Sequence, residues 1–313
     1  MIETILTNSA GQTVSGTVFL KDIRTAQTKA GKPYGELDLV EGQRSISAKW
    51  WDLPKTLPAK GILVDVTGKI DEYNGTRQLI IQSLKQNTQA NLEDFLPSAP
   101  MSESSLKHCF NILFQTIQRE HPDYAQLILH IMDESDTNLF TQPATHRGHH
   151  AYLGGLAYHT VTLTRVVMAL DSIYTHLDQG LLLTAALIHD FGKRITLSSD
   201  LDHTPTPVQT LVGNSALVDG WITRAAYHCD LDPAQDEDVL LLRHVLQCLN
   251  QGHITPAVPE AAVLVHLDQL DHTLDTFKTA YLDTEPGTCS NPIWNLDNKP
   301  VYKPSYQLDE EGL

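Results

Sequence analysis

The chain has 313 residues, of which 41% are hydrophobic and 19% charged, a composition typical of a globular protein large enough for two domains. The formal net charge of −16 is unevenly distributed, because residues 1–90 carry 11 basic and 9 acidic side chains whereas the remainder carries 11 and 29. We expect no membrane span, since no run of 18 apolar residues occurs, and no secretory signal, since the N-terminus lacks a basic start and a long apolar core. The four cysteines form no CxxC pair, which favours free thiols and a cytoplasmic protein.

Five short segments with alternating apolar and polar residues predict strands at 13–21, 34–42, 44–52, 62–71 and 76–84. Turn signals divide them, of which Asn74-Gly75 is the strongest because both residues tolerate positive φ. Five such strands predict an all-β, OB-fold-like barrel domain over residues 1–88. An SH3-like barrel agrees with the same pattern.

A proline-punctuated stretch predicts a linker over residues 89–104, after which the apolar period becomes helical. Helical segments are expected at 104–120, 153–174, 179–193, 238–249 and 260–282. They predict an all-α bundle over residues 105–290. The tail, residues 291–313, has no clear period and is expected to pack across the surface of a domain.

Aromatic and cationic side chains alternate along the predicted barrel, as single-strand binding requires. Trp50 and Trp51 are adjacent on a strand and must point to opposite faces, so one belongs to the core and Lys49 shares a face with Trp51. We predict surface contacts to nucleic acid from Lys49, Trp51, Tyr73 and Arg77. The alternative is that these residues have no role in nucleic-acid binding: the aromatic side chains fill the core of the barrel and the lysines keep its surface soluble.

Two imidazoles and two carboxylates lie beside apolar neighbours on the predicted helices: His159, His189, Asp190 and Asp268. Buried groups of this kind need partners, and a shared cation supplies one. The mixed nitrogen and oxygen set suits Mn²⁺, Fe²⁺ or Co²⁺, and is compatible with Mg²⁺ or Zn²⁺. Such an ion lowers the pKa of a bound water and polarises a phosphoryl oxygen. Lys193, three residues after Asp190, is expected on the same side of the helix, within reach of a substrate phosphate.

The ordered set H…HD…D resembles the HD-domain metal-dependent phosphohydrolases. More narrowly, the barrel followed by "HHAYLGGLAYHT", "LIHDFGK" and "LDNKPVYKP" resembles the YhaM-type 3′–5′ exoribonucleases along nearly the whole chain. The resemblance implies an OB-fold that grips single-stranded RNA or DNA and an HD domain that hydrolyses it from the 3′ end with Mn²⁺. It makes His159, His189, Asp190 and Asp268 the metal ligands. It further assigns His149, His150 and Lys193, with Asp190, to catalysis at the phosphate.

The sequence departs from the family pattern where a second ion would bind. Asn214 stands where the family has a His, and Leu249 and Asn250 stand where it has a His-His pair, although His253 is near enough to substitute. We therefore expect one metal rather than two, and a mononuclear or impaired nuclease. A nucleic-acid-binding protein without turnover and an HD-domain nucleotide phosphohydrolase are the alternatives.

Overall fold

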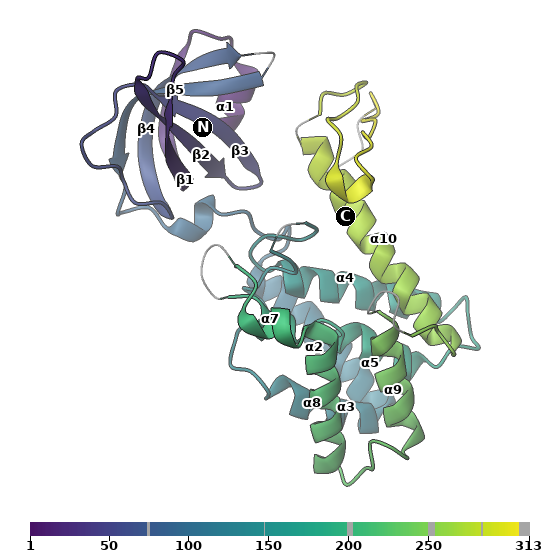
Figure 1. The fold of residues 1–313 in the computed structure, drawn as a ribbon. Coiled ribbons are helices and arrows are strands. Elements are labelled where there is room, and N and C mark those ends of the chain that lie inside the picture. Colours follow the sequence, from purple (N-terminus) through teal and green to yellow (C-terminus); the bar gives the residue numbers. More distant parts are fainter. Residues whose placement is uncertain (74–75, 147, 199–202, 250–253, 283, 307–313) are drawn as a thin grey trace. The chain divides into compact units, whose positions relative to one another are not determined.

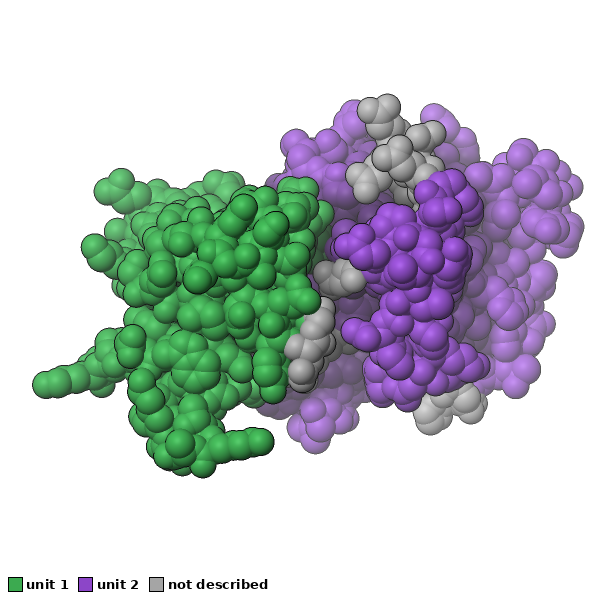
Figure 2. Space-filling model, turned by 90° about the horizontal axis from the view of Figure 1, so that it is seen from above, with its two compact units in different colours: residues 1–98 green, residues 99–313 purple. Residues whose placement is uncertain are grey.

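Five strands close into a barrel in the computed structural model (Figure 1), which describes residues 1–73, 76–146, 148–198, 203–249, 254–282 and 284–306. The chain divides into two compact units, residues 1–98 and 99–313, which are coloured separately in Figure 2. The predicted linker spans this division. No helix in the described ranges is long and apolar enough to cross a membrane.

The first unit has a short helix, five strands and a 3₁₀ turn. These are α1 (Ile2–Thr7), β1 (Thr13–Gln27), β2 (Pro33–Glu41), β3 (Arg44–Trp50), β4 (Ile62–Tyr73), β5 (Thr76–Gln86) and η1 (Leu92–Phe95). The closed order β1-β2-β3-β5-β4, with β3 and β5 parallel and the other pairs antiparallel, is that of an OB-fold. The Asn74-Gly75 turn signal lies outside the described residues.

Apolar residues at alternate strand positions fill the barrel, as the strand period requires. The core includes Val18, Leu20, Leu37, Leu39, Ile46, Trp50, Val64, Val66, Ile70 and Leu79, together with Ile2 and Ile5 of α1. Residues after β5 stay with the barrel, because the backbone N–H of Gly42 donates to Phe95 O at 3.0 Å and Gln43 Nε2 donates to Ser98 O at 2.8 Å.

The second unit is helical. Its elements are α2 (Glu103–Glu120), α3 (Pro122–Met132), α4 (Gly155–Leu170), α5 (Gln179–Ile188), α6 (Lys193–Thr196), α7 (Pro207–Leu211), α8 (Asn214–His228), α9 (Glu237–Cys248), α10 (Pro259–Leu282) and η2 (Trp294–Leu296). The predicted order of a β-barrel followed by a helical region is confirmed. Helices α3, α7 and α8 were not among the expected segments.

Helix α5 is the centre of the helical unit, because all of its residues from Gly180 to Ile188 are buried. A helix that is apolar on every side is stable only when other helices surround it, and α4, α9, α10, α3 and α2 all contact it. Its start is fixed by Asp178, whose side chain accepts a hydrogen bond from the backbone N–H of Leu181 at 2.9 Å. Its C-terminal end therefore presents His189 and Asp190 inside the bundle.

Helix α10 extends beyond the other helices, and the C-terminal segment lies at its far end (Figure 1). Lys303 Nζ donates to Tyr281 O at 2.7 Å, and Tyr281 Oη donates to Tyr302 O at 3.3 Å. The described part of the tail thus packs against the end of α10.

Candidate functional site

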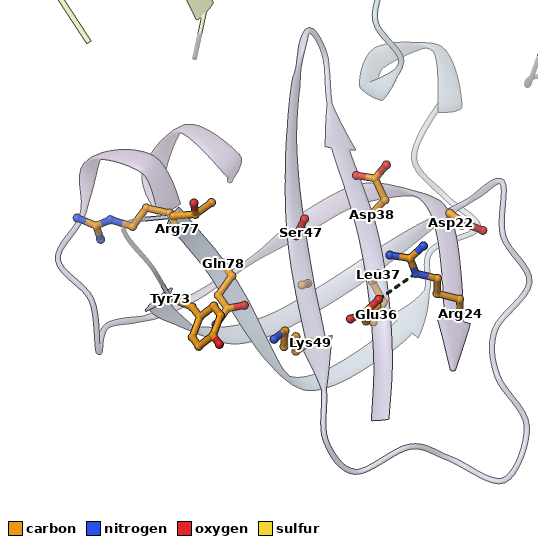
Figure 3. Close-up of a pocket in the computed structure, with 12 residues that line it drawn as sticks. Asp22, Arg24, Glu36, Leu37, Asp38, Ser47, Lys49, Tyr73, Arg77 and Gln78 are labelled. Carbon is orange, nitrogen blue, oxygen red and sulfur yellow. Dashed lines mark hydrogen bonds and ion pairs between the residues drawn. The ribbon is translucent and has the colours of Figure 1, made fainter. Parts of the chain in front are cut away.

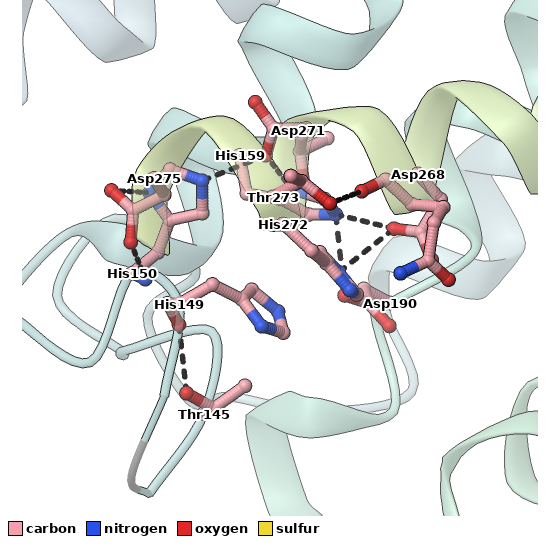
Figure 4. Close-up of polar contacts among 12 residues, drawn as sticks. Thr145, His149, His150, His159, Asp190, Asp268, Asp271, His272, Thr273 and Asp275 are labelled. Atoms are coloured by element: carbon pink, nitrogen blue, oxygen red, sulfur yellow. Dashed lines mark hydrogen bonds and ion pairs between the residues drawn. The ribbon is translucent and has the colours of Figure 1, made fainter. Parts of the chain in front are cut away.

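Three helices bring the four candidate metal ligands together. His159 lies on α4, His189 and Asp190 follow the last residue of α5, and Asp268 lies on α10; Figure 4 shows His159, Asp190 and Asp268. Gly155, the first residue of α4, cannot be replaced by a larger residue without a clash, because a Cβ there would collide with the carbonyl oxygen of His150. Gly155 therefore lets the segment that carries His149 and His150 pass close to the start of α4.

The donor atoms of the four side chains converge on one point. His159 Nε2 lies 3.0 Å from His189 Nε2, 3.3 Å from Asp268 Oδ1 and 3.6 Å from Asp190 Oδ2. Two atoms bound about 2.1 Å from one ion, at right or tetrahedral angles, lie roughly 3.0–3.4 Å apart. The distances from His159 to His189 and to Asp268 fall in this range, the distance to Asp190 lies just above it, and His159, His189 and Asp190 form one group that could hold a metal ion.

The hydrogen bonds of the two imidazoles leave their Nε2 lone pairs facing each other. His189 Nδ1 donates to the carbonyl oxygen of Ala186 at 2.9 Å, so its proton is on Nδ1. His159 Nδ1 lies 2.6 Å from Asp271 Oδ2, which favours the same tautomer. Two lone pairs 3.0 Å apart repel each other, and a divalent cation between them removes the repulsion. The donor set therefore suits a metal ion.

Without a cation, the charges of the cluster shift the pKa values of His159 and Asp190. Burial is the largest influence on His159 and lowers its pKa, but hydrogen bonds to Asp268 and Asp271 and the charge of Asp190 outweigh it and raise the pKa to about 9. Burial likewise raises the pKa of Asp190, yet the charges of Lys193 and His189 hold it well below the usual range. Lys193 Nζ lies 2.5 Å from Asp190 Oδ2. The lysine ammonium thus supports the ionised form of Asp190.

Asn214 lies beside the candidate metal centre, and its amide nitrogen contacts the His-Asp pair. Its Nδ2 donates to the carbonyl oxygen of His189 at 2.9 Å and to Asp190 Oδ1 at 3.1 Å. A Cβ on Gly192 would lie 2.6 Å from Asn214 Oδ1, so the glycine of "HDFGK" makes room for the asparagine. Asn214 therefore orients the His-Asp pair.

Among the other positions that depart from the family pattern, Leu249 is described and lies outside the cluster, because it packs against the hydrophobic core of the helical unit at the end of α9. His244, earlier on the same helix, accepts a hydrogen bond at Nε2 from the backbone N–H of Ala257 at 2.9 Å. Asn250 and His253 lie outside the described residues.

His149 and His150 have different surroundings. The His149 ring stacks on that of His272 with 3.4 Å between centroids, and burial, followed by the charges of His272 and Lys193, lowers the pKa of His149 to about 2. His150 Nε2 lies 2.7 Å from Asp271 Oδ2 and its Nδ1 lies 2.6 Å from Tyr152 Oη. Both ring nitrogens of His150 are thus engaged by protein groups, which favours a supporting role over contact with a phosphate.

From the sequence, Asp271 and Asp275 could either support the site or be solvated, and His272 had no assigned role; Asp271 and His272 both lie in the cluster (Figure 4). Together with Asp268 and Asp275 they occupy positions i, i+3, i+4 and i+7 of α10, which share one helix face. That spacing was the available signal. The sequence does not predict which face of α10 packs toward α4.

On the barrel, a groove of about 570 Å³ contains three of the four predicted nucleic-acid contacts, Lys49, Tyr73 and Arg77 (Figure 3). Trp51 lies beside the groove, with its ring 4.9 Å from that of Tyr34, while Trp50 is buried in the core. Lys49 Nζ lies 5.1 Å from the ring centroid of Tyr73 and 6.0 Å from that of Trp51. Aromatic faces and one ammonium therefore gather at this surface.

The charges that line the groove are balanced. Asp22, Glu36 and Asp38 oppose Arg24, Lys49 and Arg77. Arg24 Nε donates to Glu36 at 2.9 Å, and Arg77 Nη1 donates to Asn8 O at 2.5 Å. Burial raises the pKa of Asp38. Of the three cations, only Lys49 has its charged group over aromatic rings.

Comparisons with known proteins agree with the motifs. No protein-family model matches the chain. A curated relative, the 3′-5′ exoribonuclease YhaM of Bacillus pumilus, is 28% identical, and the similarity covers 98% of this chain and 99% of the relative. The resemblance to the YhaM-type family is thereby confirmed.

Solved structures resemble the chain only weakly. A chain of a replication protein A heterotrimer bound to ssDNA is 12% identical, with 26% of this chain and 62% of that chain covered and a TM-score of 0.22. Rim1, a mitochondrial single-stranded DNA binding protein of S. cerevisiae, is 14% identical, with 26% and 100% covered and a TM-score of 0.23. An aspartyl tRNA synthetase of Entamoeba histolytica is 10% identical, with 87% and 68% covered and a TM-score of 0.27. These scores are too low to support an inference.

Proposed function

The chain is similar along almost its whole length to a YhaM-type 3′-5′ exoribonuclease, and on that premise we propose that it is a metal-dependent phosphodiesterase that shortens single-stranded RNA from the 3′ end. The observation that carries the proposal is the convergence of His159, His189, Asp190 and Asp268 from three helices. A set of two imidazoles and two carboxylates, of which only Asp268 is partly exposed, is suited to a divalent cation. Mn²⁺ is the ion we expect, because the donors are mixed nitrogen and oxygen.

A bound divalent ion would supply an activated water and polarise the scissile phosphate. The protein would contribute the remaining functions. Lys193, whose side chain is partly exposed beside Asp190, would neutralise charge on the phosphate. Asn214 would keep the His-Asp pair oriented through its two hydrogen bonds. Residues 105–290 would form the HD domain of this enzyme.

The barrel domain would hold the strand. Lys49, Trp51 and Tyr73 offer an ammonium and aromatic faces at one surface, which is the combination that sequence-independent single-strand binding uses. Arg77 would add a second cation on the same side. A chain with Trp51→Ala and Tyr73→Ala should bind single-stranded RNA more weakly while its metal affinity stays unchanged.

The test is a gel assay of 5′-labelled single-stranded RNA with Mn²⁺. We expect a ladder that shortens from the 3′ end with the native chain and none with Asp190→Asn, which keeps the volume of the side chain and removes its charge. Asp123→Asn changes an exposed aspartate of α3 outside the cluster and should behave as the native chain. Equal shortening by the native chain and Asp190→Asn would contradict the proposed site.

A binding protein without turnover is the second candidate, and the residues at the family's second-site positions favour it. Asn214 is a weak metal ligand and Leu249 cannot ligate at all. Retention of labelled RNA by the native chain with no shortening at any Mn²⁺ concentration would select this alternative. Hydrolysis of free nucleotides without strand shortening would select the nucleotide phosphohydrolase instead.

A further inference from the structure

Two carboxylates of strand β2 line the barrel groove, Glu36 and Asp38. They are two positions apart on the strand, so both side chains point to the same face. The carboxylate of Glu36 is already used by the protein, because Arg24 Nε donates to its Oε2 at 2.9 Å and Tyr34 Oη donates to its Oε1 at 2.8 Å. Neither oxygen of Glu36 therefore needs a further donor.

Asp38, by contrast, has a carboxylate without a donor. Its neighbours in the strand register are Asp22 on β1 and Ser47 on β3, and it forms no hydrogen bond or ion pair with the residues that the structure describes. The side chain is half-buried. Burial is the largest influence on the pKa of Asp38 and raises it, while the charge of Lys21 lowers it and that of Asp22 raises it. A carboxylate that loses water without gaining donors is destabilised, and a ligand with N–H groups would remove that cost.

The charges of the groove are separated across its width (Figure 3). Lys49 and Arg77 come from β3 and β5, whereas Asp22 and Asp38 come from β1 and β2. The cation on the acidic side, Arg24, is paired with a glutamate. The phosphates of a bound strand are attracted to Lys49 and repelled by the unpaired carboxylates. The backbone of the strand is therefore expected on the side of β3 and β5, with base edges directed toward Asp38.

Guanine is the RNA base whose edge matches a carboxylate. Its N1–H and its 2-amino group are adjacent donors that point the same way, so each can reach one carboxylate oxygen. Adenine and cytosine place a ring-nitrogen acceptor beside their amino group, and uracil places its single N–H between two carbonyl oxygens. An acceptor next to the donor repels an ionised carboxylate. Proteins that recognise single-stranded RNA by sequence read such base edges.

We propose that Asp38 recognises a guanine base at one position of the bound strand. The proposal rests on the proposed function in that the groove is taken to hold single-stranded RNA. Stacking on the rings of Trp51 and Tyr73 accepts any base. Asp38 therefore adds a preference at one nucleotide to a grip that otherwise tolerates every sequence. It would determine which strands are held and would leave the chemistry of cleavage to the helical unit.

The experiment measures RNA binding by the full chain in EDTA, so that no strand is shortened. Fluorescence anisotropy gives the dissociation constants of labelled oligonucleotides that repeat UUG, UUI, UUA or UUC, where I is inosine. The native chain should bind the guanine strand at least about fivefold more tightly than the adenine strand, the lower end of what a bidentate base contact contributes. Inosine keeps N1–H but lacks the 2-amino group, so its strand should bind with intermediate affinity.

Three variants separate base recognition from charge. Asp38→Asn replaces one acceptor oxygen with a donor, so the guanine preference should disappear while the adenine strand binds at least as well as before. Asp22→Asn removes the same charge from the same part of the groove, and it should strengthen binding of all four strands alike and keep the preference. Asp94→Asn changes an exposed aspartate of η1 outside the groove and should behave as the native chain.

The outcomes distinguish this inference from the proposed function. Equal binding of the four strands by the native chain would overturn recognition by Asp38 and leave the barrel as a grip. A guanine preference that survives in a folded Asp38→Asn variant, verified by circular dichroism, would also overturn it. Loss of the preference in Asp22→Asn as well would assign it to the charge of the groove and not to Asp38. No binding of any strand would overturn both this inference and the role of the barrel, without bearing on the metal centre.

Discussion

Asp271 acts on the candidate metal centre through another residue. Its Oδ2 lies 2.6 Å from His159 Nδ1 and 2.7 Å from His150 Nε2, so one carboxylate oxygen serves two imidazoles. Hydrogen bonds from both histidines contribute to a pKa of Asp271 well below the usual range, although burial acts the other way and is the largest single influence. An ionised acceptor at Nδ1 fixes the tautomer of His159 and leaves Nε2 free to bind a metal.

Replacing Asp271 with asparagine should therefore weaken metal binding without unfolding the chain. We expect the Mn²⁺ affinity of Asp271→Asn to fall about 10- to 100-fold, the usual cost of losing a residue that orients a metal-bound histidine. Calorimetry measures the affinity, and ¹⁵N imidazole spectra of the metal-free chain above pH 9, where His159 is neutral, report its tautomer. Asp275→Asn, which changes a carboxylate that contacts only His150 of this group, should have a much smaller effect. Equal losses in the two variants would argue against tautomer control.

A carboxylate on the barrel predicts a pH dependence of stability. Asp65 accepts hydrogen bonds from Thr17 Oγ1 at 2.7 Å and Asn87 Nδ2 at 2.9 Å, and these hold its pKa below the usual value. A lowered pKa in the folded state stabilises the fold at neutral pH, and this contribution is lost as the pH falls through the folded-state pKa. Because Asp65 is exposed to solvent, the effect should be only about 0.5 kcal/mol.

The comparison is between urea unfolding of the native chain and of Asp65→Asn from pH 7 to pH 3. The native chain should be more stable at pH 7, and the difference should shrink toward the acid end. A difference that stays constant over this range would mean that the charge of Asp65 is not its cause.

At the scale of single elements, strand β4 depends on one glycine. The pairing of β4 with β5 shifts register between Thr67 and Gly68, and a Cβ on Gly68 would lie 2.7 Å from both Ile80 O and Leu79 Cγ. The contact is with backbone and with a buried core side chain, neither of which can move cheaply. The glycine within "VTGKID" is thus required by close packing of two strands.

Gly68→Ala should destabilise the barrel by about 1–3 kcal/mol, the usual cost of overpacking a close-packed core. Chemical denaturation followed by tryptophan fluorescence measures the loss, since Trp50 and Trp51 report on this unit. Gly31→Ala offers a comparison, because Gly31 has positive φ but nothing within 4 Å of an added Cβ. An unchanged stability of Gly68→Ala would contradict the packing requirement, because Gly68 has no positive φ that an alanine would strain.

The end of α5 was predictable only in part. The apolar run and the His-Asp pair predicted a helix through Lys193, whereas the helix ends at Ile188 and a separate turn, α6, begins at Lys193. The turn at Gly192 packs against Asn214, which is 22 residues away in sequence, so a local pattern does not reveal this contact. The break matters for chemistry, because the turn between the helices brings Lys193 Nζ to Asp190 Oδ2.

At the scale of the whole molecule, the secondary structure could be predicted where the local pattern of apolar residues is strong. The five strands followed from period-two alternation, and the long apolar helices followed from their period. Helix α8 was not expected, since it contains Asp219 and Gly220 and has a weak apolar stripe. The four candidate metal ligands lie up to 109 positions apart, from His159 to Asp268. Motifs identified its members, but the sequence held no information on how α4 and α10 face each other.

The division into two units predicts two separable unfolding transitions. Binding of Mn²⁺ to the folded helical unit alone should raise the temperature of one transition, by mass action on the native state, and leave the other unchanged. Scanning calorimetry with EDTA and with excess Mn²⁺ measures both. The Asp190→Asn chain is the control, and its two scans should coincide. A shift of both transitions by Mn²⁺ in the native chain would contradict a single metal-binding unit.

The balanced charge of the barrel groove has a consequence for how a strand would be held. Where Lys and Arg dominate an interface, binding is driven by counterion release and weakens steeply with added salt. Here three carboxylates oppose three cations, with Lys49 next to the rings of Tyr34, Trp51 and Tyr73. A strand held mainly by base stacking releases few counterions, so its affinity would change little with ionic strength. Such a grip would tolerate the shifts in salt that detach proteins relying on phosphate contacts.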